Sequence, residues 1–349
     1  MVLIMKKKEI ENIFTTWLED EGKDFSGVFS VSGNEGVIYQ QACGYRNKAE
    51  KLPNATDTAF GIASGTKLFT GLAVCKLIDD KKLSLEDKLW DILPFDLGQI
   101  DKRVTIFHLL THTSGVGDYI DEEDSDSEEQ LQGLYDKYPV QLWKRLKYYL
   151  QMITPLPPKF EPGERFGYSN SGFVLLGLVV EAVSGQSYQQ YVQDTIIAPS
   201  NLTHTGYYRM DSLPANVALG YMLDEETQYW HTNIFSLPIL GGSDGGIFTC
   251  AEDLDKLWRA IFSSKILSKD MTLLFLKSHV IMDEEDDQSG SYGLGVYTIG
   301  IADNNKIYYI VGGDCGVDFF SVYFTATGTV ASALGNTNVN TFPLLNSLY

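Results

Sequence analysis

Cysteine is scarce in this sequence, and long hydrophobic runs are missing. Four cysteines stand far apart in 349 residues, at positions 43, 75, 250 and 315, and none belongs to a C-x-x-C pair. This spacing argues against a zinc site or a disulfide framework and fits reduced thiols. No stretch of about 18 consecutive apolar residues occurs, so the sequence predicts no membrane-spanning helix.

Positive charge is also in short supply. Lysine and arginine number 27 against 46 aspartates and glutamates, which gives a formal net charge of −19. Nucleic acids and anionic membranes bind to basic surfaces, so the sequence predicts neither as a partner. The apolar residues at 1–5 precede the lysines at 6–8, the reverse order of a secretory signal. We therefore expect a cytoplasmic protein.

The hydrophobic pattern indicates strands towards both ends of the chain and helices between them. Helices are predicted at 5–20, 68–78, 106–111, 141–152 and 172–183. Strands are predicted at 27–32, 36–44, 293–299, 306–311, 320–324 and 329–334. We expect an α+β fold with one antiparallel sheet built from both ends of the chain and an inserted, mainly helical lobe.

Two runs of acidic residues stand out, at 121–129 and 283–287. Because like charges at this density repel one another, we expect both runs to be solvated loops. A calcium site is the alternative, although neither run has the glycine turn of a helix-loop-helix calcium loop.

Ser64 and Lys67 are the first candidates for chemistry. They follow a strand-like segment at 58–63 and precede the apolar run at 68–78, so a helix would place both side chains on one face, one turn apart. Backbone N–H groups at a helix start favour negative charge on a bound carbonyl oxygen, and burial lowers the pKa of a lysine towards that of a base. The alternative is that Ser64 merely caps the helix beside a surface lysine.

Tyr168 and Asn170 are the second candidates. They lie in an aromatic-rich loop that follows a Pro-Gly turn and precedes a predicted helix. The alternative is that Asn170 or Ser171 caps this helix and Tyr168 is a packed aromatic residue. The same Y-x-N pattern occurs at 45–47 in a strand context, so the tripeptide alone is weak evidence.

Five motifs occur in a fixed order. They are S-x-x-K at 64–67, H-L-L-T-H-T-S-G at 108–115, P-G-E at 162–164, Y-S-N at 168–170 and G-G-I-F-T-C-A-E-D-L at 245–254. Together they resemble the superfamily of class C β-lactamases, penicillin-binding proteins and D-alanyl-D-alanine carboxypeptidases, which also contains esterases and peptidases. The resemblance implies a β-lactamase/transpeptidase-like fold, with an antiparallel sheet flanked by terminal helices. We expect one catalytic domain over 1–349, with a sheet lobe at 1–60 and 235–349 and a helical lobe at 61–234.

The resemblance also implies a role for each candidate residue. Ser64 is the expected nucleophile, and either Lys67 or Tyr168 can take its proton, so the two are expected to titrate as a coupled pair. Asn170 is expected to contact Lys67 and the amide of the substrate. No metal and no organic cofactor is implied.

The third motif of that superfamily is Lys or His, then Thr, Ser or Gly, then Gly. It falls here on Ile310, Val311 and Gly312, so its first two positions depart from the pattern. The resemblance implies that Gly312 lets a substrate backbone lie close to the strand, and that the N–H of Gly313 joins that of Ser64 as an oxyanion donor. Without the usual cation and hydroxyl, we expect poor recognition of substrate carboxylates.

Two other patterns favour structural roles. His108 and His112 are spaced for one helix face, but Leu109 stands where a zinc protease of the H-E-x-x-H type needs glutamate. Ser243 lies in a G-x-S-x-G pattern, yet two glycines follow it where an α/β-hydrolase needs an immediate helix.

The sequence therefore predicts a serine hydrolase that forms an acyl-enzyme at Ser64 on a small-molecule or peptide ester or amide. One alternative is a D-alanyl-D-alanine carboxypeptidase or a weak β-lactamase. Another is a catalytically weakened binding or sensor protein. The sequence does not indicate an oligomeric state.

Overall fold

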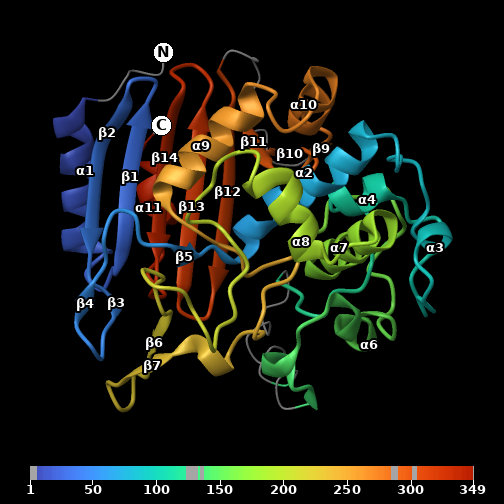
Figure 1. Ribbon diagram of the computed structural model, residues 1–349, viewed down its shortest axis with the longest axis horizontal. Helices are drawn as coiled ribbons and strands as arrows, with labels where there is room; N and C mark the ends of the chain where they lie inside the picture. The colour runs from blue at the N-terminus through green and yellow to red at the C-terminus, as the bar shows by residue number, and fades with distance from the viewer. Residues whose placement is uncertain (1–5, 123–132, 134–136, 284–289, 301–304, 349) are drawn as a thin grey trace.

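The computed structural model describes residues 6–122, 133, 137–283, 290–300 and 305–348. In it, an eight-stranded antiparallel sheet forms one side of the molecule. Its strand order is β2-β1-β14-β13-β12-β11-β10-β9. The bounds are Gly27–Gly33 for β1, Gly36–Cys43 for β2, Val280–Ile281 for β9, Ser291–Tyr292 for β10, Tyr297–Ile299 for β11, Ile307–Asp314 for β12, Val317–Phe324 for β13 and Thr329–Gly335 for β14. Because β1 pairs with β14, the two ends of the chain meet in one sheet, as predicted (Figure 1).

The terminal helices α1 (Lys7–Asp20) and α11 (Phe342–Asn346) pack on one face of this sheet. Alternate residues of β13 point to opposite faces. Phe320 joins Phe14 of α1 and Leu344 of α11 in one buried cluster, whereas Phe319 belongs to the cluster on the other face. Helix α9 (Ala251–Phe262) covers that other face, in front of the sheet in Figure 1.

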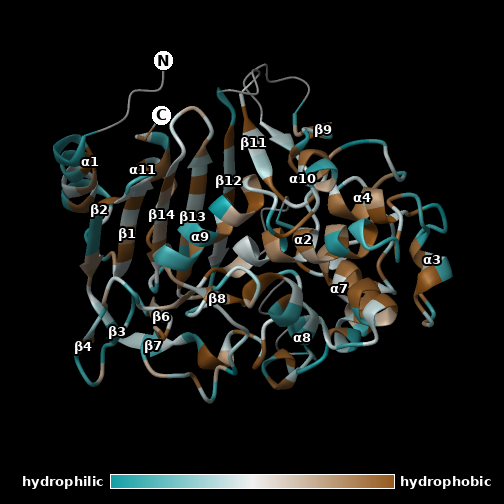
Figure 2. Ribbon diagram, turned by 45° about the horizontal axis from the view of Figure 1, so that its top comes forward, coloured by the Kyte–Doolittle hydropathy of each residue, from teal (hydrophilic) through white to brown (hydrophobic). Residues whose placement is uncertain are grey.

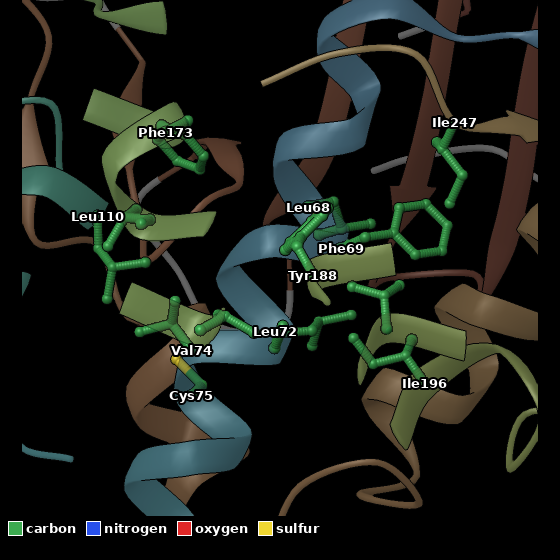
Figure 3. Close-up of a cluster of buried hydrophobic side chains, with 14 of the residues drawn as sticks. Leu68, Phe69, Leu72, Val74, Cys75, Leu110, Phe173, Tyr188, Ile196 and Ile247 are labelled. Atoms are coloured by element: carbon green, nitrogen blue, oxygen red, sulfur yellow. The ribbon is translucent and has the colours of Figure 1, made fainter. Parts of the chain in front are cut away.

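The second half of the molecule is built around two apolar helices, α2 (Thr66–Asp79) and α7 (Asn170–Ser184). Most of α2 is buried on all sides, which is the pattern of a central core helix. Figure 3 shows Leu68 and Leu72 of α2 near Tyr188 and Ile196, and Phe173 of α7 beside Leu110. Hydrophobic residues dominate α7 and recur along α2 in Figure 2.

Shorter elements complete the fold. The helices are α3 (Leu89–Ile92), α4 (Ile106–Leu110), α6 (Leu150–Ile153), α8 (Tyr188–Val192) and α10 (Lys269–Leu276), with the helical turns η1 (Ala63–Gly65), η2 (Val140–Leu142), η3 (Leu146–Tyr149), η4 (Gln193–Ile197) and η5 (Asn233–Phe235). The small strand pairs are β3 (Tyr45–Asn47) with β4 (Leu52–Pro53), β5 (Phe60–Gly61) with β8 (Phe248–Thr249), and β6 (Tyr221–Leu223) with β7 (Trp230–Thr232). None of the helices in these described ranges is long and apolar enough to cross a membrane.

Two predicted elements were wrong in extent. The segment 141–152 is not one helix but the turns η2 and η3 followed by α6. From Val140, just before this segment, buried residues recur every three positions at Trp143, Leu146 and Tyr149, a period that suits 3₁₀ turns rather than a continuous α-helix. The predicted strand at 293–299 shrinks to β11, because a hydrogen bond from the N–H of Gly293 to the carbonyl oxygen of Val296 closes a turn.

Candidate active site

Ser64 lies in the 3₁₀ turn η1, which leads directly into α2. We expected the serine at the start of the α-helix, but the helix begins two residues later, at Thr66. Ala63 has a φ angle of 43°, in the left-handed region that residues with a side chain seldom occupy. The turn is held by the Thr66 hydroxyl, which donates to the Ala63 carbonyl oxygen at 2.7 Å and accepts from the N–H of Ile247 at 3.1 Å. Strain of this kind is common at functional sites.

Lys67 lies one turn after Ser64 and is buried, with 3% of its surface exposed. Its Nζ is 2.9 Å from Ser64 Oγ, 2.7 Å from Asn170 Oδ1 and 2.8 Å from the carbonyl oxygen of Asp244. The last two atoms can only accept hydrogen bonds. A neutral Lys67 amine therefore has a partner for each of its two hydrogens, and its lone pair is left to accept the proton of Ser64.

Tyr168 reaches Ser64 from the loop before α7. Its hydroxyl is 2.8 Å from Ser64 Oγ. Burial, and then the proximity of Tyr297, raises the pKa of Tyr168 well above its usual value, so its hydroxyl is protonated at neutral pH. Burial lowers the pKa of Lys67, although the nearby Asp244 carboxylate opposes this shift. Of the two predicted bases, Lys67 is the one whose environment favours proton acceptance.

The His112 ring packs against the ring of Tyr168. The two rings lie 4.6 Å apart between centroids, and His112 Nδ1 accepts a hydrogen bond from the N–H of Ser169 at 3.1 Å. The carbonyl oxygen of His112 accepts from the N–H of Gly167 at 2.8 Å, so both neighbours of Tyr168 are tied to one residue. Burial keeps the pKa of His112 well below its usual value, which leaves a neutral imidazole. Sequence reasoning assigned His112 a structural role but did not connect it to Tyr168.

No metal site joins the two histidines in the described part of the chain. His108 Nδ1 instead accepts from the N–H of Thr105 at 3.3 Å, at the start of α4. The one group of potential metal ligands found among the described residues is His204, Cys250 and Asp253, and it includes neither histidine of the motif. Asp253 in that group is already contacted by the Lys256 ammonium at 3.2 Å.

Asn170 is the first residue of α7, and two carboxylates fix its position. Asp118 accepts from the N–H of Asn170 at 2.7 Å and from the N–H of Ser171 at 2.8 Å. The side-chain Nδ2 of Asn170 donates to Glu122 Oε1 at 2.8 Å. The contact with Lys67 that we expected of Asn170 is present, and Glu122 accepts one of the two hydrogens of Asn170 Nδ2.

The surroundings of Lys67 are strongly acidic. Asp118, Glu122, Asp244 and Asp314 all lie close enough to interact electrostatically with its ammonium group. Burial raises the pKa of Asp118 and of Asp314 to about 7, and it raises that of Asp244 as well. Glu122 belongs to the acidic run predicted at 121–129, of which 123–129 lie outside the described residues, as does most of the second run at 283–287.

Gly312 places strand β12 against the turn that carries Ser64. A Cβ atom on Gly312 would lie 2.3 Å from the carbonyl oxygen of Ile62 and 2.9 Å from the nitrogen of Ser64. The absence of a side chain is thus needed for contact between the strand and the nucleophile turn, a reason that the sequence did not reveal. Gly313 has open space where a Cβ would project, and it lines the cleft together with Ser64.

The two departures from the third motif differ in their surroundings. Ile310 is 3% exposed and packs in the hydrophobic core shared by the sheet and α2. Val311 lines the cleft beside Ser64 and Tyr168. The described residues that line this part of the cleft include no lysine, arginine or histidine, so the cation of the usual motif is not replaced there.

Ser243, the other serine considered from the sequence, is fully buried. Its Oγ has no hydrogen-bond partner in the described ranges, so nothing there activates it as a nucleophile.

Known proteins resemble this chain in sequence and in fold. The family model described as Beta-lactamase matches residues 16–342. The chain belongs to the beta-lactamase family. Penicillin-binding protein 4* of Bacillus subtilis is 30% identical over 279 residues, which cover 76% of this chain and 58% of that protein. Protein flp of Staphylococcus aureus is 31% identical over 197 residues, which cover 56% of this chain and 37% of flp. The chain thus spans about half the length or less of these curated relatives.

Solved structures match over nearly the whole chain. A penicillin-binding protein from Bacillus halodurans is 38% identical, with a TM-score of 0.87 and coverage of 97% of this chain and 98% of that one. An octameric penicillin-binding protein homologue from Pyrococcus abyssi is 27% identical, with a TM-score of 0.79 and coverage of 96% and 74%. EstCE1, a hydrolase with promiscuous acyltransferase activity, shares the fold at 21% identity, with a TM-score of 0.77 and coverage of 98% of both chains. The predicted β-lactamase/transpeptidase-like α+β fold is confirmed for this family member.

Proposed function

We propose that this protein hydrolyses an ester or amide through an acyl-enzyme formed on Ser64. The observation that carries the proposal is the position of Ser64 Oγ, which lies 2.9 Å from Lys67 Nζ and 2.8 Å from the Tyr168 hydroxyl. A serine with a base and a second proton carrier in hydrogen-bond range is the arrangement of an activated nucleophile.

The proposed acylation transfers the acyl group to Ser64 and, in net terms, moves one proton from Ser64 to the leaving group. Ser64 Oγ attacks the substrate carbonyl carbon while its proton passes to the neutral Lys67 amine. The N–H groups of Ser64 and Gly313 stabilise the oxyanion. When the bond to the leaving group breaks, Tyr168 donates its hydroxyl proton to that group and regains a proton from Lys67. Water then attacks the acyl carbon and gives a proton to Tyr168, which passes one to Lys67. Lys67 protonates Ser64 Oγ as the acid product leaves, which restores Ser64.

The cleft favours substrates without a carboxylate near the scissile bond. Glu122 faces the same cleft as Ser64, and the described lining offers no cation beside Val311. An unpaired carboxylate would lose solvation there without compensation. A D-alanyl-D-alanine carboxypeptidase or weak β-lactamase remains the second candidate, because the relatives at 30% and 38% identity are both named penicillin-binding proteins.

Covalent labelling tests the proposal. A fluorophosphonate probe should add to the peptide that contains Ser64, and both label and ester turnover should vanish in Ser64→Ala. Ser243→Ala is the matched control, because it removes a hydroxyl that is buried and distant from solvent. Label on Ser243, or turnover that survives in Ser64→Ala, would refute the proposal. Binding of substrates without any turnover in the wild type would instead indicate the weakened sensor protein.

Two further predictions accompany this proposal. The catalytic unit is one domain over 1–349 with the two lobes given above, so limited proteolysis should release no separately folded fragment. Its location is the cytoplasm, which fractionation of cells that express the natural gene would test.

A further inference from the structure

Tyr168, the acid of the proposed reaction, lies in a loop rather than on a helix or strand. Its hydroxyl has to stay 2.8 Å from Ser64 Oγ and also reach the leaving group. Loops move more than the elements they connect, so a residue that acts from a loop needs contacts that hold it in place. His112, which takes no part in the proton transfers, contacts the Tyr168 ring and the backbone on both sides of Tyr168.

The hydrogen bonds of His112 fix which of its ring nitrogens carries the proton. Nδ1 lies 3.1 Å from the backbone nitrogen of Ser169, a group that can only donate, so Nδ1 is the acceptor. In a neutral imidazole the proton is then on Nε2, which donates to the hydroxyl oxygen of Tyr292 at 3.2 Å. Burial, and then the nearby charge of Lys67, keeps the pKa of His112 well below its usual value. The neutral form, which can accept from Ser169, therefore persists at neutral pH.

The His112 ring is enclosed and cannot turn away from Tyr168. Only 1% of the surface of His112 is exposed. Four aromatic rings surround it at centroid distances of 4.6 to 5.6 Å, those of Phe166, Tyr168, Phe173 and Tyr292. Because side chains this closely packed leave no free volume, the ring stays fixed and its Nδ1 stays directed at Ser169.

The acceptor at His112 matters because Ser169 connects two parts of the site. Ser169 is 3% exposed, so its N–H would be buried without a partner if Nδ1 were removed. Its hydroxyl also caps α7, where it accepts from the N–H of Gly172 at 3.0 Å. A shift of the Ser169 backbone towards another acceptor would therefore displace its neighbour Tyr168.

We propose that His112 is a positioning residue that holds the Tyr168 hydroxyl where it protonates the leaving group, an inference that rests on the acyl-enzyme function proposed above. Loss of the His112 acceptor should then matter in proportion to the proton that the leaving group needs. An alkoxide has to be protonated as its bond to the acyl carbon breaks, whereas 4-nitrophenolate leaves as the anion. His112 thus allows the reaction of alkyl esters and amides, which have poor leaving groups.

Two esters of one acid test this dependence. 4-Nitrobenzyl butyrate has an alkoxide leaving group, 4-nitrophenyl butyrate has a stable phenolate, and kcat/KM reports the acylation of Ser64 by each. His112→Phe keeps an aromatic ring and removes the acceptor. It should lower kcat/KM for the benzyl ester by about tenfold or more, and for the phenyl ester by less than about threefold.

A conservative variant and a matched control complete the series. His112→Asn keeps a side-chain acceptor for Ser169, and asparagine tolerates the left-handed φ of 57° at this position. Its kcat/KM for the benzyl ester should exceed that of His112→Phe by about fivefold, the effect of one hydrogen bond. His108→Phe removes an imidazole that accepts from the N–H of Thr105, away from Tyr168, and should leave both esters within about twofold of wild type.

A double-mutant cycle separates positioning from general damage to the fold. Tyr168→Phe has no acid to position, so the addition of His112→Phe should change kcat/KM for the benzyl ester by less than about twofold. The same loss in both backgrounds, or equal losses for the two esters in His112→Phe, would overturn the inference. A wild type that cleaves only the 4-nitrophenyl ester would overturn it as well, because no leaving group would then be protonated.

Hydrogen exchange gives a readout that does not depend on turnover. The amide hydrogen of Ser169 should exchange faster in His112→Phe than in the wild type and stay protected in His112→Asn. Unchanged protection in His112→Phe would refute the contact and overturn the inference alone. If exchange behaves as expected but Ser64 is never acylated in the wild type, the hydrolase proposal fails, and His112 is left with a structural contact only.

Discussion

Substitution of Gly312 by alanine tests whether the contact between β12 and the nucleophile turn positions Ser64. The added Cβ would lie 2.3 Å from the carbonyl oxygen of Ile62, whereas ordinary contact begins at 3.4 Å. The strand and the turn must therefore separate by about 1 Å, because the obstructing atoms are backbone and cannot rotate away. A displacement of this size at reacting groups lowers catalysis by about 10²-fold. The same overpacking should reduce the free energy of unfolding by about 1–3 kcal/mol.

Stopped-flow acylation with an activated neutral ester and thermal or urea unfolding measure the two effects of Gly312→Ala. Gly172→Ala is the matched control, since its Cβ would meet no atom closer than 3.5 Å and it lies within α7. That variant should retain its acylation rate and gain up to about 1 kcal/mol of stability from higher helix propensity. Gly312→Ala with wild-type acylation and stability would refute the reasoning, because the turn would then accommodate the methyl group without moving.

Three further outcomes follow from the site. Lys67→Ala and Tyr168→Phe should each slow acylation by about 10²-fold or more. In the double variant the acylation rate should fall by less than the product of the two single effects, because the residues act as one unit. Near wild-type acylation in both single variants would reject their roles. The acylation rate of a neutral ester should rise with pH as Lys67 loses its proton, with a midpoint below the usual lysine pKa. Asp244→Asn should move that midpoint to lower pH, because it removes a carboxylate that raises the pKa of Lys67. A shift of the midpoint to higher pH would contradict this prediction. Val311→Lys should increase the ratio of penicillin to neutral-ester acylation by about tenfold through one charge-assisted contact. Ile310→Lys should chiefly destabilise the protein, because it buries a charge in the core. Equal ratios in wild type and Val311→Lys would show that the cleft lacks more than a cation.

Local patterns in the sequence were sufficient for several features. Ser64 and Lys67 are three residues apart, and a helical turn brings such neighbours together whatever the rest of the chain does. Short runs rich in β-branched and aromatic residues identified most of the sheet strands, because such side chains fit the pleated surface of a sheet. The order of the motifs, together with the excess of 46 acidic over 27 basic residues, narrowed the function before any contact was known.

The tertiary structure decided which distant groups surround that pair. Lys67 meets Asn170 across 103 positions and the carbonyl oxygen of Asp244 across 177, and no periodicity links such residues. His112 packs against Tyr168, and the backbone contact at Gly312 leaves no room for a side chain. Both contacts depend on how packed elements meet, which is set by side-chain volumes throughout the core.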